Sequence, residues 1–315
     1  MSNSRKKDYT IERLSAHSLP DMECLYTAVY NKTPVNGFFA QKYNTAFTGV
    51  EYTGFIAYNT DQTPIAFYGV IPCFIDLGDR IILSAQSADT MTHPDYRNQG
   101  LFVELALHTY QLCRECGIEL IFGFPNQNSL PGFVNKLGWK KTEHLDLFII
   151  PTGTFSWGRF FRKFSLTKRL FENYQHLILK PYLLPQNGME NAVLKDGFAG
   201  VYRDHHYLQY KTYTKTQLIR IGQSILWIKI SHTLLIGDLS VIPADFYILM
   251  DQLIKLARKL GLKEIHFHTS SGTTLHNLFA GRFNPIPSFP VIFKNLAGDT
   301  VTGNIKFTAA DIDTF

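Results

Sequence analysis

Residues 93–102, HPDYRNQGLF, place one arginine, two amides and one glycine between a strand-like run and a helix-like run. A helix N-terminus leaves backbone N–H groups unpaired, and the helix macrodipole adds partial positive charge there. Phosphate or pyrophosphate is the natural ligand of such a site. Gly100 would let the backbone approach the ligand closely, and Arg97 would add a full positive charge. The loop therefore predicts an anion site, although a single-glycine turn taken alone is more often only a turn.

One strand and one helix position this loop. The strand-like run is RIILSAQSADTMT, residues 80–92, and the helix-like run extends from Leu101 to Gly117. Leu101, Leu105 and Leu112 recur at helical spacing, and glycine is the residue that a helix C-terminus prefers. The run IELIFGF follows, so the order of strand, helix and strand predicts a parallel pair. Upstream runs with turn signals predict an antiparallel meander.

The same order recurs in the second half of the chain. Gly261 ends a second helix-like run 144 residues after Gly117. Trp139 and Phe283, which precede matching strand-like runs, are also 144 residues apart. We therefore predict an α/β protein with two tandem lobes, each a mixed sheet flanked by helices. The expected domains are residues 1–150, a basic helical connector at 151–189 and a second lobe at 190–315.

The second lobe lacks the loop. At the same offset, Arg97, Asn98, Gln99 and Gly100 correspond to Val241, Ile242, Pro243 and Ala244. The second copy thus has neither arginine nor glycine, and its proline removes a backbone donor. A turn required only by the fold would be expected in both copies. The difference indicates that the first loop binds a ligand.

Composition limits the class of protein. A chain of 315 residues with 45% hydrophobic content suits a two-domain globular protein. No apolar run approaches the roughly 20 residues of a membrane span, and the N-terminus MSNSRKKDYTIERL lacks the apolar stretch of a signal peptide. Four cysteines are too few for a disulfide scaffold. We therefore expect a cytoplasmic protein whose net charge of +5 suits an anionic ligand without requiring nucleic acid.

The predicted connector is unusually basic and amphipathic. Residues 159–180 contain six basic residues, Arg159, Arg162, Lys163, Lys168, Arg169 and Lys180, against the single acid Glu172. Apolar residues recur at helical spacing, namely Phe160, Phe164, Phe171, Tyr174 and Ile178. A connector helix with a solvated basic face explains this pattern. Contact with an anionic acceptor or a membrane surface is the alternative.

Metal and redox sites receive little support. His266 and His268 fall on one face of a strand, and His205 with His206 adds two more imidazoles. No carboxylate or cysteine at ligand spacing accompanies them, so we expect no metal. The C-x-x-C of residues 113–116 lies in the last turn of a helix, whereas redox pairs use a helix N-terminus.

The stretch MTHPDYRNQGLF resembles the acyl-CoA-binding motif of the GCN5-related N-acetyltransferases (the GNAT superfamily), V-x-P-x-x-R-x-x-G-x-[GA]. Pro94, Arg97 and Gly100 match in place. Thr92 stands at the valine position, and Phe102 stands where Gly or Ala is usual. FGFPNQNSLPGFVNKLGW is similar to the family's second landmark, an asparagine-containing strand end followed by a helix and G-[FW]. The resemblance covers about residues 9–150 by motif and the second lobe by topology.

The resemblance implies acetyl-CoA as the co-substrate, held where the fourth strand splays from the fifth. The backbone of Met91 and Thr92 would pair with the pantetheine arm and the acyl group, and a backbone N–H near the thioester would stabilise the oxyanion. Gln99, Gly100, Leu101 and Phe102 would bind the pyrophosphate, and Arg97 and Asn98 would be further cofactor-binding residues of the loop. Asn126 and Asn128 would hold the other side of the cofactor.

Acyl transfer to an amine requires the neutral amine, so a general base should lie beside the cleft. Asp89, just before the cofactor-binding backbone, is our candidate, and a structural role accepting backbone hydrogen bonds is the alternative. His93, before a proline, suits a capping role better. The tyrosine that many family members use as general acid is absent from residues 133–135. Tyr96 could serve instead, or the thiolate could leave unassisted.

The predicted function is therefore acetyl-CoA-dependent N-acetyl transfer, by direct attack, to the amine of a small molecule. The second lobe would shape the acceptor site, and the oligomeric state is left open. Two alternatives remain. A non-catalytic CoA-binding module is favoured by the missing tyrosine. A Fem-like aminoacyl transferase would use the basic connector, but such enzymes do not normally keep a CoA loop.

Overall fold

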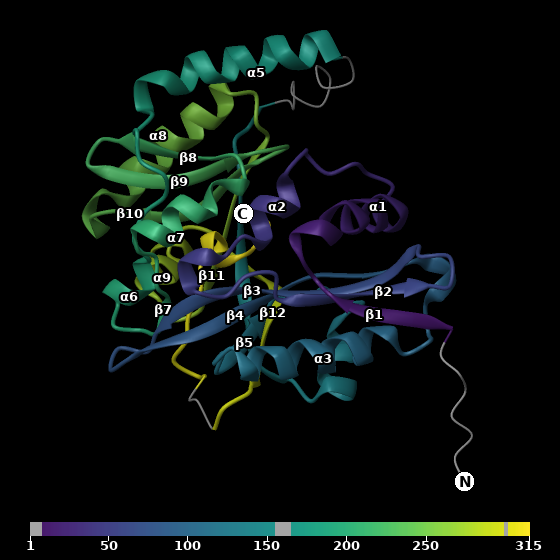
Figure 1. Ribbon diagram of the computed structural model, residues 1–315. Coiled ribbons are helices and arrows are strands. Elements are labelled where there is room, and N and C mark those ends of the chain that lie inside the picture. The colour runs from purple at the N-terminus through teal and green to yellow at the C-terminus, as the bar shows by residue number, and fades with distance from the viewer. Residues whose placement is uncertain (1–7, 155–164, 299–301) are drawn as a thin grey trace. The chain divides into compact units, whose positions relative to one another are not determined.

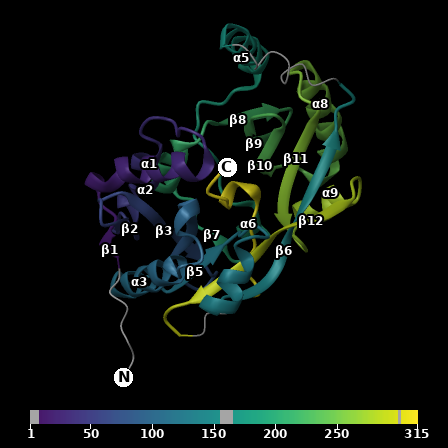
Figure 2. The same cartoon turned by 90° about the vertical axis from the view of Figure 1, so that its right-hand side faces the viewer.

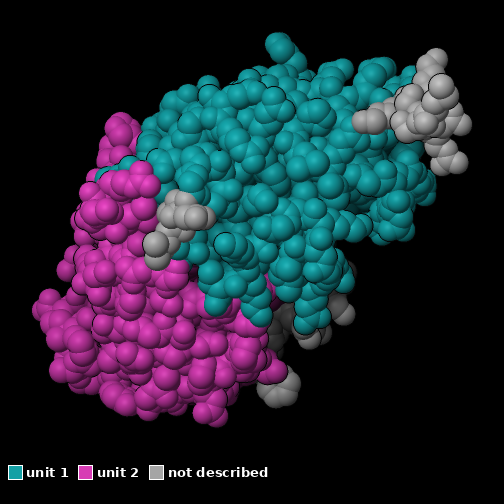
Figure 3. All heavy atoms as spheres, turned by 90° about the horizontal axis from the view of Figure 1, so that it is seen from below, with its two compact units in different colours: residues 1–75, 81–142, 291–302 teal, residues 76–80, 143–290, 303–315 magenta. Residues whose placement is uncertain are grey.

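A computed structural model describes residues 8–154, 165–298 and 302–315 of the chain (Figure 1). The chain divides into two compact units, coloured separately in Figure 3. Unit 1 comprises residues 1–75, 81–142 and 291–302, and unit 2 comprises residues 76–80, 143–290 and 303–315. Strands and helices occur in both units, so the predicted mixed α/β class is confirmed.

Unit 1 contains a mixed sheet in the order β1-β2-β3-β4-β5-β12. Its strands are β1 (Tyr9–Arg13), β2 (Gly54–Asn59), β3 (Pro64–Asp76), β4 (Ile81–Thr92), β5 (Leu120–Gly123) and the end of β12 (Pro285–Asn295). The pairs β1/β2, β2/β3 and β5/β12 are antiparallel, whereas β4 and β5 are parallel. Strands β2, β3 and β4 are the meander expected from the sequence.

Helices cover both faces of this sheet (Figure 1). Helix α3 (Leu101–Glu115) joins β4 to β5 and buries Leu105 and Tyr110 in one core. Helices α1 (Leu19–Tyr30) and α2 (Phe38–Tyr43) build a second core on the other face, with Phe39 fully buried. Helix α3 was predicted, whereas α1 and α2 were not.

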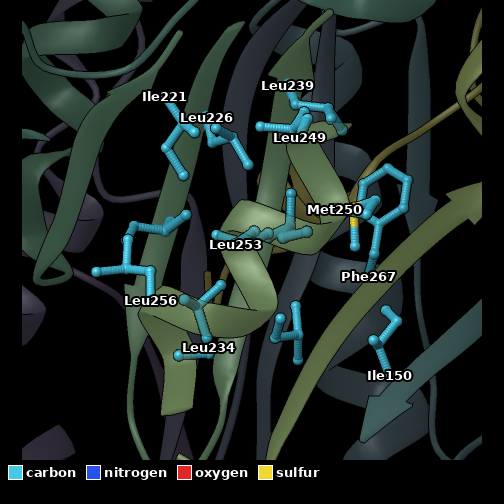
Figure 4. Packing of buried hydrophobic residues seen from close by; sticks show 14 of the residues in the cluster. Ile150, Ile221, Leu226, Leu234, Leu239, Leu249, Met250, Leu253, Leu256 and Phe267 are labelled. Atoms are coloured by element: carbon cyan, nitrogen blue, oxygen red, sulfur yellow. The ribbon is translucent and has the colours of Figure 1, made fainter. Parts of the chain in front are cut away.

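Unit 2 contains the neighbouring strands β6-β11-β10-β9-β8, with both parallel and antiparallel pairs (Figure 2). These strands are β6 (Lys140–Pro151), β11 (Glu264–Ser270), β10 (Leu234–Ser240), β9 (Ser224–Ile230) and β8 (Thr216–Ile221). Helix α8 (Phe246–Lys259) joins the parallel strands β10 and β11 and packs Leu249, Leu253 and Leu256 onto the sheet (Figure 4). The remaining elements are α5 (Ser165–Leu179), α6 (Ala192–Lys195), β7 (Gly200–Val201), α7 (His205–Tyr210) and α9 (Thr274–Ala280).

Each unit therefore contains a parallel strand, helix, strand motif, as the internal repeat predicted. The spacing needs one correction. Helix α3 has Gly100 as its N-cap and α8 has Asp245, which are 145 residues apart rather than 144. The loop before α8 is thus one residue longer than the expected offset allows. The difference between the two loops remains, because Asp245 rather than a glycine precedes the second helix.

Two strands determine how the chain divides. Residues 145–151 of β6 pair with β11 in unit 2, and residues 292–295 of β12 pair with β5 in unit 1. The compact units therefore differ from a division at residues 150 and 190. In the expected connector, α5 begins at Ser165, and its apolar face packs into the unit 2 core through Leu179. Residues 155–164, with Arg159, Phe160, Arg162, Lys163 and Phe164, lie outside the described residues, as do the side chains of 165–168.

Candidate functional site

The pairing of β4 with β5 ends well before β4 does. The parallel register stops at Gln86 opposite Phe122, whereas β4 continues to Thr92. The intervening β4 backbone has no partner strand on the β5 side within the described chain. Backbone N–H and C=O groups on such a free edge can pair with an extended ligand.

The loop that follows presents a run of unpaired backbone donors. Among the described residues, the N–H groups from Asn98 to Phe102 make no intramolecular hydrogen bond, and the first helical bond is Val103 N to Gly100 O at 3.0 Å. Asn98 and Gly100 have φ values of 64° and 85°, in the left-handed region. Consecutive donors at a helix N-terminus form a concave site for an anion. This is the geometry that the sequence predicted for the loop.

Most of the predicted site residues line one pocket of about 530 Å³ in unit 1. They are Thr92, Tyr96, Arg97, Asn98, Gln99, Gly100, Leu101, Phe102, Asn126 and Asn128. The pocket also has lining residues that the sequence analysis missed, namely Val29, Tyr30, Thr90, Val103, Ser129, Gly132 and Lys136. Val29 and Tyr30 belong to α1, whose position beside β4 no local pattern reveals.

The charged residues that line this pocket are all basic. Arg97 and Lys136 are exposed, and no lining residue is Asp or Glu. Two cations beside unpaired N–H groups favour a doubly charged diphosphate. Lys136 could not be assigned from its sequence context, because it occupies an ordinary solvent-facing helical position.

Gly100 is required by backbone conformation. An added Cβ would meet no atom within 4 Å, so packing does not exclude a side chain. The φ of 85°, however, disfavours any residue with a Cβ. The same Cβ would project into open space beside the unpaired donors, where a ligand phosphate would lie.

Phe102, the departure from the family pattern, lies against Gly132. Its ring centroid is 5.1 Å from that of Phe133 and 6.0 Å from that of Tyr68. A Cβ at Gly132 would be only 2.9 Å from Cε1 of Phe102. The large side chain is therefore accommodated by an aromatic cluster and by a glycine on the neighbouring helical turn.

Asn126 shapes the opposite wall of the pocket. Its Oδ1 accepts hydrogen bonds from the backbone N–H groups of Asn128 (2.9 Å) and Ser129 (3.0 Å). This Asx turn starts the short helix at Gly132–Lys136. The side-chain oxygen of Asn126 is thus committed to the turn, and Asn128 is exposed at its tip.

Asp89 lies outside the pocket lining and is paired. Its Oδ2 is 2.7 Å from Nζ of Lys42 and accepts a 2.9 Å hydrogen bond from the Tyr43 hydroxyl. Lys42 is only 1% exposed, so Asp89 compensates a buried cation from α2. Asp89 also has a φ of 41° within β4, a conformation that Asp tolerates better than most residues. Met91 is buried against the same α1 and α2 cluster, which leaves only its backbone to face a ligand.

Tyr96 and His93 have distinct surroundings. The Tyr96 hydroxyl accepts a hydrogen bond from Nδ2 of Asn59 at 3.1 Å, so its own proton is directed elsewhere. His93 Nδ1 accepts from the Asp95 backbone N–H at 3.4 Å and caps the 3₁₀ turn.

In unit 2 the corresponding gap is filled by the chain itself. The β10/β11 register ends at Ile236 opposite Phe267, and beyond it Ser270 N donates to Phe307 O at 2.9 Å. A Cβ at Gly237 would be 2.1 Å from the ring of Phe315, so residues near the end of the sequence pack tightly on β10.

A fully buried ion-pair network holds this segment. Arg203 pairs with Asp238 of β10 at 2.6 Å and with Asp311 at 2.7 Å, and all three side chains are unexposed. The two carboxylates raise the pKa of Arg203 despite its burial.

Within the described residues, no group of three or more His, Cys, Asp or Glu side chains is arranged to hold a metal ion. His266 pairs with Glu264 at 3.0 Å, and His205 contacts Gln209 at 2.8 Å. In that same part of the chain, no helix has the length and apolarity needed to cross a membrane.

Comparison with known proteins identifies the class. Residues 10–142 match the family model of the acetyltransferase (GNAT) domain. These residues are therefore a GNAT domain, and the resemblance carried by the opening loop is confirmed. No curated protein sequence matches this chain.

Solved structures share the fold over nearly the whole chain. A probable N-acyltransferase from Enterococcus faecalis has a TM-score of 0.62 at 12% identity, over 92% of this chain and 73% of that chain. A GCN5-related N-acetyltransferase from Kribbella flavida gives 0.56 at 12%, over 92% and 72%. Saccharomyces cerevisiae N-myristoyltransferase with bound myristoyl-CoA gives 0.56 at 10%, over 92% and 80%. At such identities the likeness concerns the fold.

Proposed function

We propose that this chain is an acetyl-CoA-dependent N-acetyltransferase that acts on the amine of a small molecule by direct transfer. The GNAT domain supports acyl transfer from an acyl-CoA. The observation that carries the proposal is the run of unpaired N–H groups from Asn98 to Phe102, beside Arg97 and Lys136. The free edge of β4 leads directly into this run, in the order that a thioester, a pantetheine arm and a diphosphate require.

In the proposed reaction, the neutral amine attacks the thioester carbonyl, a C–N bond forms and the C–S bond breaks. A backbone N–H of the free β4 edge would stabilise the oxyanion. The amine's proton passes to a base, for which Asp89 remains our candidate through its second oxygen, Oδ1. Tyr96 could return a proton to the CoA thiolate, since its hydroxyl hydrogen is not used by Asn59.

A non-catalytic CoA-binding module is the second candidate. The helix before Gly138 offers no hydroxyl at residues 133–135, since Phe133 and Val134 have apolar side chains and Asn135 has an amide. The two candidates share a binding site and differ in turnover.

Thermal unfolding with acetyl-CoA tests the shared site. A ligand that binds only the folded state raises the Tm. The paired substitutions Arg97→Ala and Gly100→Val should abolish the acetyl-CoA shift and leave a folded apoprotein. An unchanged shift would reject the loop as the site. Screening amines for CoA release then separates the candidates: release with any amine supports the enzyme, and binding without release from all of them supports the module.

A further inference from the structure

We propose that the outer face of α5, with the basic pocket beside it, docks the protein on an anionic membrane surface. This inference concerns unit 2 and is independent of the acyl-CoA pocket in unit 1. It rests on two exposed leucines, on cations without ion-pair partners and on a pocket that contains no carboxylate.

The inner face of α5 is fixed on unit 2. The Tyr174 hydroxyl donates to the Lys259 carbonyl at 3.0 Å, and Gln175 Nε2 donates to the Leu260 carbonyl at 2.9 Å. Phe171 and Leu179 are buried on the same side. These contacts determine which side of the helix faces solvent.

The outward side carries apolar residues. Leu170 is 68% exposed and Leu177 is 66% exposed. Seven residues are about two turns, so both leucines lie on one face of the helix. A purely connecting role does not explain why the helix exposes two leucines on one face. Burying both leucines on binding would remove apolar surface from water, which is favourable.

Basic residues surround this face. Arg169 and Lys180 are exposed, and neither forms an ion pair in the described part of the chain. Glu172 is the single acidic residue of α5.

A pocket of about 600 Å³ continues the basic surface from the end of α5. Its lining includes Arg220, Lys255 and Lys259, all exposed, and no Asp or Glu. Pro181 and Tyr182, directly after α5, form part of the same wall. Three cations around one hollow fit an anionic headgroup.

A bilayer fits this surface better than a protein partner does. Protein interfaces are depleted in lysine at their centre, whereas interfacial helices combine Leu, Phe and Trp with Lys and Arg. The apolar component is two leucines rather than a broad patch, so the electrostatic component must supply much of the affinity. Attachment would therefore be peripheral, sensitive to salt and dependent on anionic lipid.

Co-sedimentation of the full chain with vesicles tests this inference. We expect binding to phosphatidylcholine vesicles that contain phosphatidylserine, little binding to pure phosphatidylcholine, and release at high salt. Leu170→Glu with Leu177→Glu should weaken binding about tenfold or more, as should Arg220→Gln, Lys255→Gln and Lys259→Gln together.

Matched controls use exposed residues elsewhere. Leu107→Glu in α3 alters a leucine that is 57% exposed, and Lys140→Gln with Lys141→Gln removes exposed charge from β6. Both controls should bind vesicles normally, and the test variants should keep the circular dichroism spectrum and the cooperative thermal unfolding of the unmodified protein, which shows intact folding. Absence of binding to anionic vesicles, equal binding to neutral ones, or an equal loss in the controls would overturn the proposal.

Discussion

The Phe102 ring occupies the space that a side chain at Gly132 would need, with a Cβ position only 2.9 Å from Phe102 Cε1. Phe102 lies in the first turn of α3, and Gly132 lies on the short helix that forms another wall of the pocket. The aromatic residue and the glycine are thus complementary, and each is tolerated because of the other.

Gly132→Ala should therefore displace Phe102 into the pocket. Because overpacking costs about 1–3 kcal/mol, we expect a lower Tm and weaker acetyl-CoA binding. Adding Phe102→Leu should recover much of both losses, as a double-mutant cycle by thermal unfolding and calorimetry would measure. If the effects of the two substitutions are additive, the contact between Phe102 and Gly132 affects neither the Tm nor acetyl-CoA binding.

Gly100→Ala and Gly117→Ala form a matched pair at the two ends of α3. Both glycines have positive φ, 85° and 78°, and neither has an atom within 4 Å of an added Cβ. Each substitution should lower the free energy of unfolding by about 1–2 kcal/mol. Only Gly100→Ala should also weaken acetyl-CoA binding in calorimetry. Equal affinities in the two variants would place the ligand away from this loop.

Substitutions in the Lys42–Asp89 ion pair distinguish a catalytic role of Asp89 from a structural one. Removing one partner of a buried ion pair costs about 3–5 kcal/mol, so Lys42→Met and Asp89→Asn should both lower the Tm. If Asp89 is the general base, Asp89→Asn should in addition reduce kcat by about 10²–10⁴-fold, while Lys42→Met keeps the carboxylate and most of the activity. Equal losses of kcat in the two variants would make Asp89 a positioning residue that holds β4.

His268 should make folding sensitive to acid. Burial, reinforced by the charge of His266, lowers the pKa of His268 from 6.5 to about 4. Between these values the unfolded state binds a proton that the folded state does not, so stability falls as the pH drops from 6.5 towards 4, by at most about 1.4 kcal/mol per unit. His268→Leu should flatten this part of a denaturation profile. A slope unchanged in His268→Leu would contradict the assignment.

The sequence predicted the features that depend on neighbouring residues. Helix α3, its end at Gly117 and the loop at Gly100 are all specified locally, by apolar spacing and by glycine at positive φ. That loop lines one pocket together with Asn126 and Asn128, because both segments follow the ends of adjacent parallel strands.

Long-range features could not be predicted in this way. Lys42 resembles a surface lysine until its partner, 47 residues later in the chain, is placed beside it. Tyr30 reaches the pocket only because α1 packs across β4, and no local pattern specifies that contact. Phe102 was a departure from a motif, and only its contact with Gly132 explains why it is tolerated.

The pairing of β12 with β5 has a consequence for the synthesis of this protein. β5 ends at Gly123, yet the part of β12 that pairs with it is residues 292–295, so most of the chain must be made before that edge is covered. A growing polypeptide would carry an uncovered edge throughout this interval, and such edges recruit other strands. Nascent chains halted before residue 292 should consequently be bound by chaperones or cut by proteases, whereas the finished molecule should resist both.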